Sequence, residues 1–157
     1  MSQETPTTEQ ILSAYAAEEA ALTALCARIP DDSWDTLQRA DGWTIHDIIA
    51  HIVDGTFGIP RLLTGGISPE GLDLNALNEQ RRQQNHAIAH AEVVERIPQA
   101  FAAARAAAEQ VTDLNAPGPF GPDRTVGQWL QIIAFHSASH RQEIDELLLP
   151  AATTPAS

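Results

Sequence analysis

The sequence predicts an all-α protein built as a four-helix bundle. Leu, Ala, Glu and Gln are plentiful, and β-branched and aromatic residues never form the alternating runs of strands. A length of 157 residues with 43% hydrophobic residues suits one domain around a single core. Long loops separate four principal helices, which indicates an antiparallel or crossover bundle spanning residues 8–149.

The first helix is predicted over residues 8–28, after a disordered N-terminus at residues 1–7. Its apolar stripe comprises Ile11, Leu12, Tyr15, Leu22, Leu25 and Cys26. Glu18 and Glu19 flank a gap in this stripe. The pattern favours both carboxylates in solvent and leaves open that one points into a polar cleft near a metal. Cys26 lies on the apolar face, which favours a small core residue over a catalytic thiol.

The second helix is predicted over residues 45–63, with Thr44 as its N-cap and Asp47 completing a capping box. The apolar residues of this helix are Ile45, Ile48, Ile49, Ile52 and Val53. His51 lies at the edge of this stripe, a position that suits a ligand facing a cleft. His46 lies about 140° around the helix from His51, so we expect a surface or cap residue there.

A short helix is predicted over residues 74–87 and a bundle helix over residues 91–112, with Pro98 in the early turns of the latter. The predicted stripe of the bundle helix is Val94, Ile97, Phe101, Ala104, Ala108 and Val111. His86 and His90 are spaced as a pair of metal ligands. Their surroundings are polar and only Glu92 offers a third ligand, so a second metal site is not favoured. We expect His86 in solvent and His90 in the cleft as a speculative substrate contact.

The last helix is predicted over residues 126–148, with Thr125 as its N-cap and a disordered tail at residues 150–157. One stripe at helical spacing contains Val126, Trp129, Ile133, His136, His140, Ile144 and Leu147. His136 and His140 lie one turn apart on one face, so both imidazoles can reach one point. A shared metal would spare each ring the cost of about 1–3 kcal/mol for an unpaired buried polar group. Two core histidines bonded to hydroxyls or carbonyls remain the alternative.

Acidic pairs elsewhere in the chain have the pattern of solvated charges. Glu143 with Glu146, and Asp31 with Asp32, are the examples.

Two segments together resemble the DinB-like metalloprotein superfamily over roughly residues 8–149. The first contains Trp43, Asp47 and His51, and the second contains His136, His140, Arg141, Glu143 and Ile144. The resemblance implies a four-helix bundle whose metal ligands are His51, His136 and His140, and often a homodimer. The resemblance also makes Arg141 part of the family's second motif segment. We expect Arg141 to pair with an acid on a neighbouring helix, with a contact to an anionic substrate as the alternative.

Three histidines leave at least one coordination position open, as catalytic sites do. Zinc or nickel is expected first, with iron or cobalt also suited to three imidazoles. The resemblance implies a metal-dependent enzyme, a low-molecular-weight-thiol S-transferase or isomerase that acts on a small electrophile. The alternatives are a metal-dependent hydrolase that uses metal-bound hydroxide, and a non-catalytic bundle that binds a metal or small molecule.

Charge and composition exclude several other classes of function. The net charge of −12 argues against binding to nucleic acids and to anionic membranes. No apolar stretch reaches about 18 residues. The sequence MSQETPTTEQ lacks the features of a secretory signal, and the single cysteine fits a cytoplasmic protein. No nucleophile elbow, P-loop or dinucleotide-binding glycine pattern is present.

Overall fold

The computed structural model describes residues 4–150. Its helices are α1 Thr8–Arg28, α2 Ser33–Thr36, α3 Ile45–Leu63, α4 Leu74–Asn85, α5 His90–Glu109 and α6 Val126–Leu148. A small antiparallel pair, β1 Pro117–Gly118 and β2 Gly121–Thr125, precedes α6. The prediction of an all-α protein is therefore confirmed, with the short α2 and this hairpin as elements that were not predicted.

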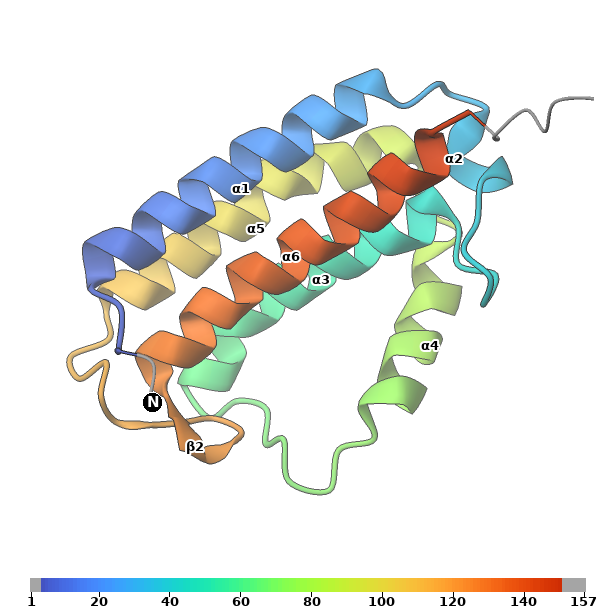
Figure 1. The fold of residues 1–157 in the computed structure, drawn as a ribbon. Coiled ribbons are helices and arrows are strands. Elements are labelled where there is room, and N and C mark those ends of the chain that lie inside the picture. The colour runs from blue at the N-terminus through green and yellow to red at the C-terminus, as the bar shows by residue number, and fades with distance from the viewer. Residues whose placement is uncertain (1–3, 151–157) are drawn as a thin grey trace, which may run out of the picture.

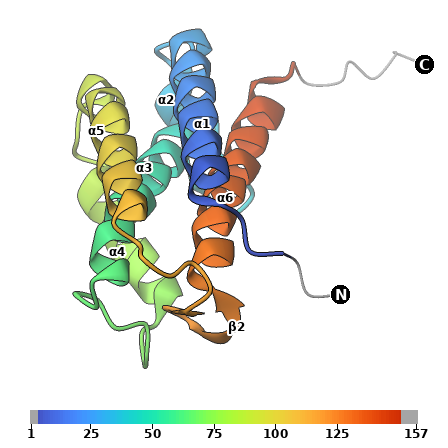
Figure 2. The ribbon, with the colours of Figure 1, turned by 90° about the vertical axis from the view of Figure 1, so that its left-hand side faces the viewer.

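Four long helices form the bundle (Figures 1 and 2). Helix α1 contacts α5 and α6, and α3 contacts the same two helices from the opposite corner. Helices α3 and α5 run in the same direction, because α4 carries the chain back along the outside of α3 (Figure 1). The bundle is thus of the crossover type, and α4 forms an extra wall beside α3.

Three capping boxes fix where the long helices begin. Thr7, Thr44 and Thr125 each accept a hydrogen bond from the backbone N–H three residues later, and that later side chain bonds back to the cap. The caps predicted at Thr44 and Thr125 are confirmed. Pro60 and Pro98 lie inside α3 and α5 without ending them.

The core lies between the four long helices. Ile11, Ile48, Ile97, Leu130 and Ile144 are at most 1% exposed. The buried valine of α5 is Val93, whereas Val94, the predicted stripe residue, is only partly buried. The Tyr15 hydroxyl donates to the Leu130 carbonyl at 2.8 Å, and burial raises the pKa of that hydroxyl. This bond ties α1 to the middle of α6.

The structure contradicts the favoured interpretation that the Glu18 carboxylate lies in solvent. Its side chain is buried between α1 and α6 and accepts hydrogen bonds from Arg141 and from the Ser137 hydroxyl. Glu19, its neighbour, pairs with Arg105 of α5. The gap in the apolar stripe of α1 is therefore filled by ion pairs to two neighbouring helices.

The N-terminal approach to α1 is held by contacts with α6. Pro6 is buried, and the Thr5 hydroxyl lies 3.2 Å from that of Thr125. Disorder was predicted for residues 1–7 and 150–157. Of these residues, 1–3 and 151–157 lie outside the described range. None of the helices between residues 4 and 150 has the length and apolar character needed to cross a bilayer.

Candidate metal centre

The structure brings together the three histidines expected as metal ligands. One ring nitrogen from each of His51, His136 and His140 lies within 4.8 Å of the others. The ring of His51 on α3 is 5.3 Å from that of His136 and 5.0 Å from that of His140. The rings of His136 and His140 are 4.4 Å apart, as their spacing on α6 predicts.

The histidines of α6 lie at the edge of the bundle. His136 is exposed and His140 is partly buried, whereas Ala134 and Ser137 occupy the buried face of this helix. The alternative of two histidines satisfied inside the core is therefore wrong for His136. Its ring is open to a cleft, where a ligand can reach it.

Glu143 orients His140. Its Oε2 accepts a hydrogen bond from Nδ1 of His140 at 2.9 Å. This bond places the proton on Nδ1 and leaves the Nε2 lone pair free, which is the arrangement found around metal-binding histidines. The interpretation of Glu143 as a solvated charge is therefore wrong, because its carboxylate supports a cluster residue.

Arg39 binds the Glu143 carboxylate on the side away from the core. Its Nη1 donates to Oε2 of Glu143 at 2.9 Å, and its Nε and Nη2 bind the carboxylate of Asp41. The guanidinium also lies over the ring of Trp43, 5.0 Å from its centroid. Trp43 in turn meets His51 edge-on at 5.5 Å. The loop before α3 thus packs around two of the three histidines.

The electrostatics of the cluster favour the neutral forms of His51 and His136. Burial lowers the pKa of His51 to about 4, and positive charge on a protonated His140 or His136 would act in the same direction. Desolvation of the ring by the surrounding protein, and charge on a protonated His140, also lower the pKa of His136. Neutral imidazole is the form that binds a metal, so at neutral pH these two rings need no deprotonation before binding.

The donor set fits a divalent transition metal. Nε2 of His136 and Nε2 of His140 lie 3.1 Å apart. Two nitrogens each about 2.0–2.1 Å from a tetrahedral ion lie about 3.3–3.4 Å from each other, so a small adjustment accommodates the ion. Among residues 4–150 the group contains three imidazoles and no fourth ligand, which leaves a position for a small molecule.

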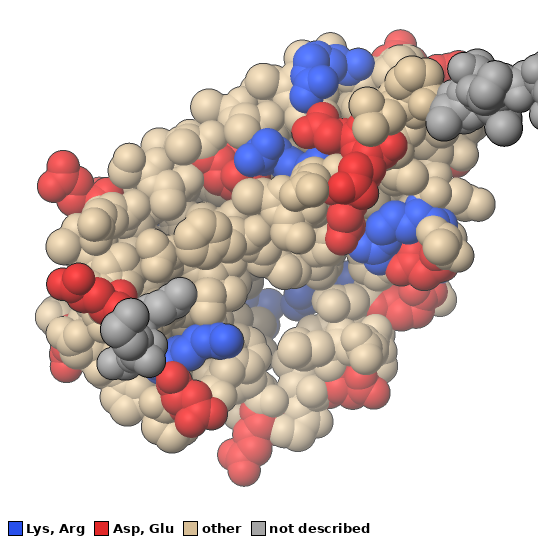
Figure 3. Space-filling view, viewed as in Figure 1, with Lys and Arg blue, Asp and Glu red and all other residues tan. Residues whose placement is uncertain are grey.

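Two cavities of opposite character meet at the cluster. An apolar pocket of about 230 Å³ is lined by His51 and His136 together with Leu62, Leu72, Leu77, Phe120, Trp129 and Ile133. A polar cleft of about 360 Å³ is lined by all three histidines together with Arg39, Asp41, Asn75, Asn78 and Glu79. Figure 3 shows the surface hollowed between α6 and α4, where these walls meet. The histidines are therefore accessible from a polar side and from an apolar side.

The residues expected as substrate contacts lie elsewhere. His90 stacks on Trp34 with ring centroids 4.8 Å apart, and its Nε2 lies 2.8 Å from Asp35. Arg141 binds Glu18, which is the structural pairing favoured for it. His86 is exposed as expected, but His46, expected at the surface, is 2% exposed. The short α2 covers the first turn of α3 with Trp34 and so buries His46.

The roles of several residues around the cluster were not identified from the sequence. Glu143 had a signal, since it lies three residues after His140 and so on the same side of α6. Arg39, Asn75 and Asn78 had none, because loops and α4 bring them to the cleft.

Comparison with protein families gives a match over most of the chain. The model of the DinB superfamily matches residues 14–144, which include all three histidines of the cluster. Neither the curated proteins nor the solved structures contain a match to the chain.

Proposed function

The chain belongs to the DinB superfamily, and we propose that it is a metal-dependent enzyme that joins a low-molecular-weight thiol to a small electrophile, or isomerises that electrophile. His51, His136 and His140 would hold the metal. A bound divalent ion lowers the pKa of a thiol or water in its open position. The observation that carries the proposal is the position of the three histidines between a polar cleft and an apolar pocket.

The two cavities suit two different reactants. Asn75, Asn78 and Arg39 offer hydrogen bonds in the polar cleft to the polar groups of a thiol cofactor. The leucines and aromatic rings of the apolar pocket suit the carbon skeleton of an electrophile. In a transfer, the thiol sulfur bonds to the electrophilic carbon, the leaving group departs with its electron pair, and the thiol proton passes to solvent.

The position of Arg81 favours a substrate electrophile that carries an anionic group. It lines the apolar pocket, and no carboxylate within residues 4–150 forms an ion pair with it. A guanidinium in this setting binds a carboxylate well, through two parallel hydrogen bonds. We therefore favour a small apolar electrophile that carries a carboxylate.

The carboxylates near the cluster argue against the hydrolase alternative. Arg39 binds Asp41, which lowers the pKa of that carboxyl, and Arg82 lowers the pKa of Glu79 to about 2. Partial burial raises the pKa of Glu143, but its bonds with His140 and Arg39 outweigh this and lower it. Carboxylates held in this way are poor general bases at neutral pH.

The test combines metal analysis with a thiol-transfer assay. Tag-free protein is analysed by inductively coupled plasma mass spectrometry, then loaded with zinc or nickel. It is then assayed with cysteine, glutathione or coenzyme A against chlorodinitrobenzene and against an unsaturated carboxylic acid. We expect metal-dependent consumption of a thiol, lost in His51→Ala and in His136→Ala/His140→Ala.

The control variant is Phe135→Ala, which removes an exposed side chain beside His136. It should keep both the metal and the activity. Metal-loaded protein that hydrolyses ester or amide substrates without any thiol would replace our proposal with the hydrolase. Protein that binds metal but turns over neither class of substrate would support a non-catalytic binding bundle.

A further inference from the structure

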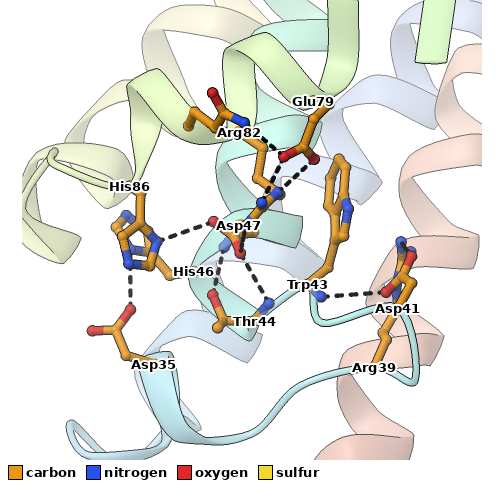
Figure 4. Close-up of polar contacts among 11 residues, drawn as sticks. Asp35, Arg39, Asp41, Trp43, Thr44, His46, Asp47, Glu79, Arg82 and His86 are labelled. Carbon is orange, nitrogen blue, oxygen red and sulfur yellow. Dashed lines mark hydrogen bonds and ion pairs between the residues drawn. The ribbon is translucent and has the colours of Figure 1, made fainter. Parts of the chain in front are cut away.

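The three remaining histidines form a second cluster on another side of α3. His46 from α3, His86 from the end of α4 and His90 from the start of α5 gather around Asp35 of α2. We propose that Asp35, His46, His86 and His90 form a second divalent-cation site, independent of the site at His51. Figure 4 shows His46 and His86 lying side by side above Asp35.

The distances bring three of these side chains around a common point and place His90 on the other oxygen of Asp35. Nδ1 of His46 lies 3.3 Å from Oδ1 of Asp35, and Nε2 of His90 lies 2.8 Å from Oδ2. One ligand atom from each of Asp35, His46 and His86 lies within 4.8 Å of the others. The ring of His46 is 4.7 Å from that of His90 and 6.0 Å from that of His86.

His46 presents a buried ring nitrogen to Asp35. Its side chain is 2% exposed, and its Nδ1 lies 3.3 Å from Oδ1 of Asp35. A neutral imidazole has one N–H and one lone pair. With the proton on Nε2, the lone pair of Nδ1 faces a carboxylate that has no proton to donate, and a divalent cation between the two atoms would bind both.

The surroundings support these side chains as metal sites do. Trp34 forms one wall, stacked on His90 at 4.8 Å and edge-on to His46 at 6.3 Å. Nδ1 of His86 lies 3.4 Å from Oδ1 of the buried Asp47, whose other oxygen accepts bonds from the Thr44 backbone and from Arg82 (Figure 4). A carboxylate that orients the second nitrogen of a histidine is a common supporting contact in metal sites.

Three imidazoles and one carboxylate match a zinc-type ion with four protein ligands. The 3.3 Å between Asp35 and His46 equals about the edge of a tetrahedron with bonds of 2.0–2.1 Å. His86 is the most exposed histidine of the cluster and has room to close onto the ion. Such an ion would hold α2, α4 and α5 to α3, so its effect is on stability and not on the chemistry at His51.

The test counts metal ions in four forms of the tag-free protein. These are the wild type, His86→Ala/His90→Ala, His136→Ala/His140→Ala, and the combined variant. Each is loaded with zinc, dialysed and analysed by inductively coupled plasma mass spectrometry, and cobalt is substituted to record its visible absorption. We expect two equivalents in the wild type, one in each double variant and none in the combined variant.

Thermal unfolding gives an independent readout. Zinc should raise the melting temperature of His136→Ala/His140→Ala but not that of the combined variant, since only a folded site binds the ion. The control is Glu92→Ala/Glu95→Ala, which removes exposed acids of α5 and should keep two equivalents. The proposal is overturned if the wild type holds one equivalent of metal and the variant His86→Ala/His90→Ala holds the same amount. If the wild type instead holds one equivalent of metal, and only His86→Ala/His90→Ala loses it, the result would support this site and contradict the metal centre at His51.

Discussion

Arg141 binds the buried carboxylate of Glu18 through two hydrogen bonds, from Nε at 2.6 Å and from Nη2 at 3.0 Å. This pair joins α1 to α6 about one turn along α1, and about three turns along α6, from the Tyr15–Leu130 bond. Replacing Arg141 with Leu leaves a buried carboxylate with Ser137 as its remaining partner, so the free energy of unfolding should fall by about 2–4 kcal/mol. Urea denaturation followed by circular dichroism measures this loss.

The double variant Glu18→Leu/Arg141→Leu removes both charges at once. Much of the lost stability should return, because no buried charge remains without its partner. A double variant as unstable as the sum of the two single variants would show that the pair does not act as a unit.

Glu143→Gln should weaken metal binding about 10–100-fold, because the amide orients His140 less strongly than the carboxylate does. Competition with a chromophoric chelator measures the affinity. Glu146→Gln is the matched control, since Glu146 lies one turn further along α6, is exposed and binds Gln142. Equal affinity in wild type and Glu143→Gln would mean that His140 needs no support from this carboxylate.

The metal-free protein should lose stability in mild acid. The pKa of His51 falls from 6.5 to about 4 on folding, chiefly through burial. The unfolded chain therefore takes up this proton at a higher pH than the folded chain does, and the free energy of unfolding declines as the pH falls from 6.5 to about 4. Urea denaturation over this range should show a smaller decline for His51→Gln than for the wild type. Parallel curves for the two proteins would contradict the depressed pKa.

Cys26 should not react with thiol reagents in the folded protein. Burial raises the pKa of its thiol to about 12, so almost no thiolate forms at pH 8. Ellman's reagent should therefore label this single cysteine only after urea is added. Rapid labelling without urea would show that the α1 end of the bundle opens readily.

Arg81→Gln should raise the KM for a carboxylated electrophile about 10-fold or more while metal content stays unchanged, because the charged partner in the apolar pocket is lost. The comparison is steady-state kinetics with an electrophile that has a carboxylate and with its methyl ester. Arg124→Gln, an exposed arginine on β2, is the control. An equal loss with acid and ester would assign Arg81 a structural role.

Local signals in the sequence were enough for the four long helices and for two of the three histidines of the cluster. The limits of α1 and α3, the caps Thr44 and Thr125, and the convergence of His136 and His140 all depend on residues within one or two turns. The position of His51 at the edge of an apolar stripe made it a candidate, and the family resemblance placed it in the ligand set, because no spacing in a sequence shows that α3 faces α6.

The errors concern side chains whose surroundings come from distant segments. His46 is buried because α2 places Trp34 over it, and Glu18 is buried because Arg141 lies opposite it on α6. The shift from Val94 to Val93 likewise follows from how α5 packs against α1 and α3. For His46 and Glu18 the amino acid alone suggests exposure, and a partner from another helix decides otherwise.

Helix α4 has no fully buried residue, and polar side chains attach it to α3: Arg82 and His86 contact Asp47, and Asn85 contacts Asp54. Attachment of this kind weakens as ionic strength rises, whereas the apolar packing of the four long helices does not. Because α4 walls both cavities, salt should loosen access to the histidines well before it affects the bundle. Hydrogen exchange in α4 at low and high salt would reveal this separate opening.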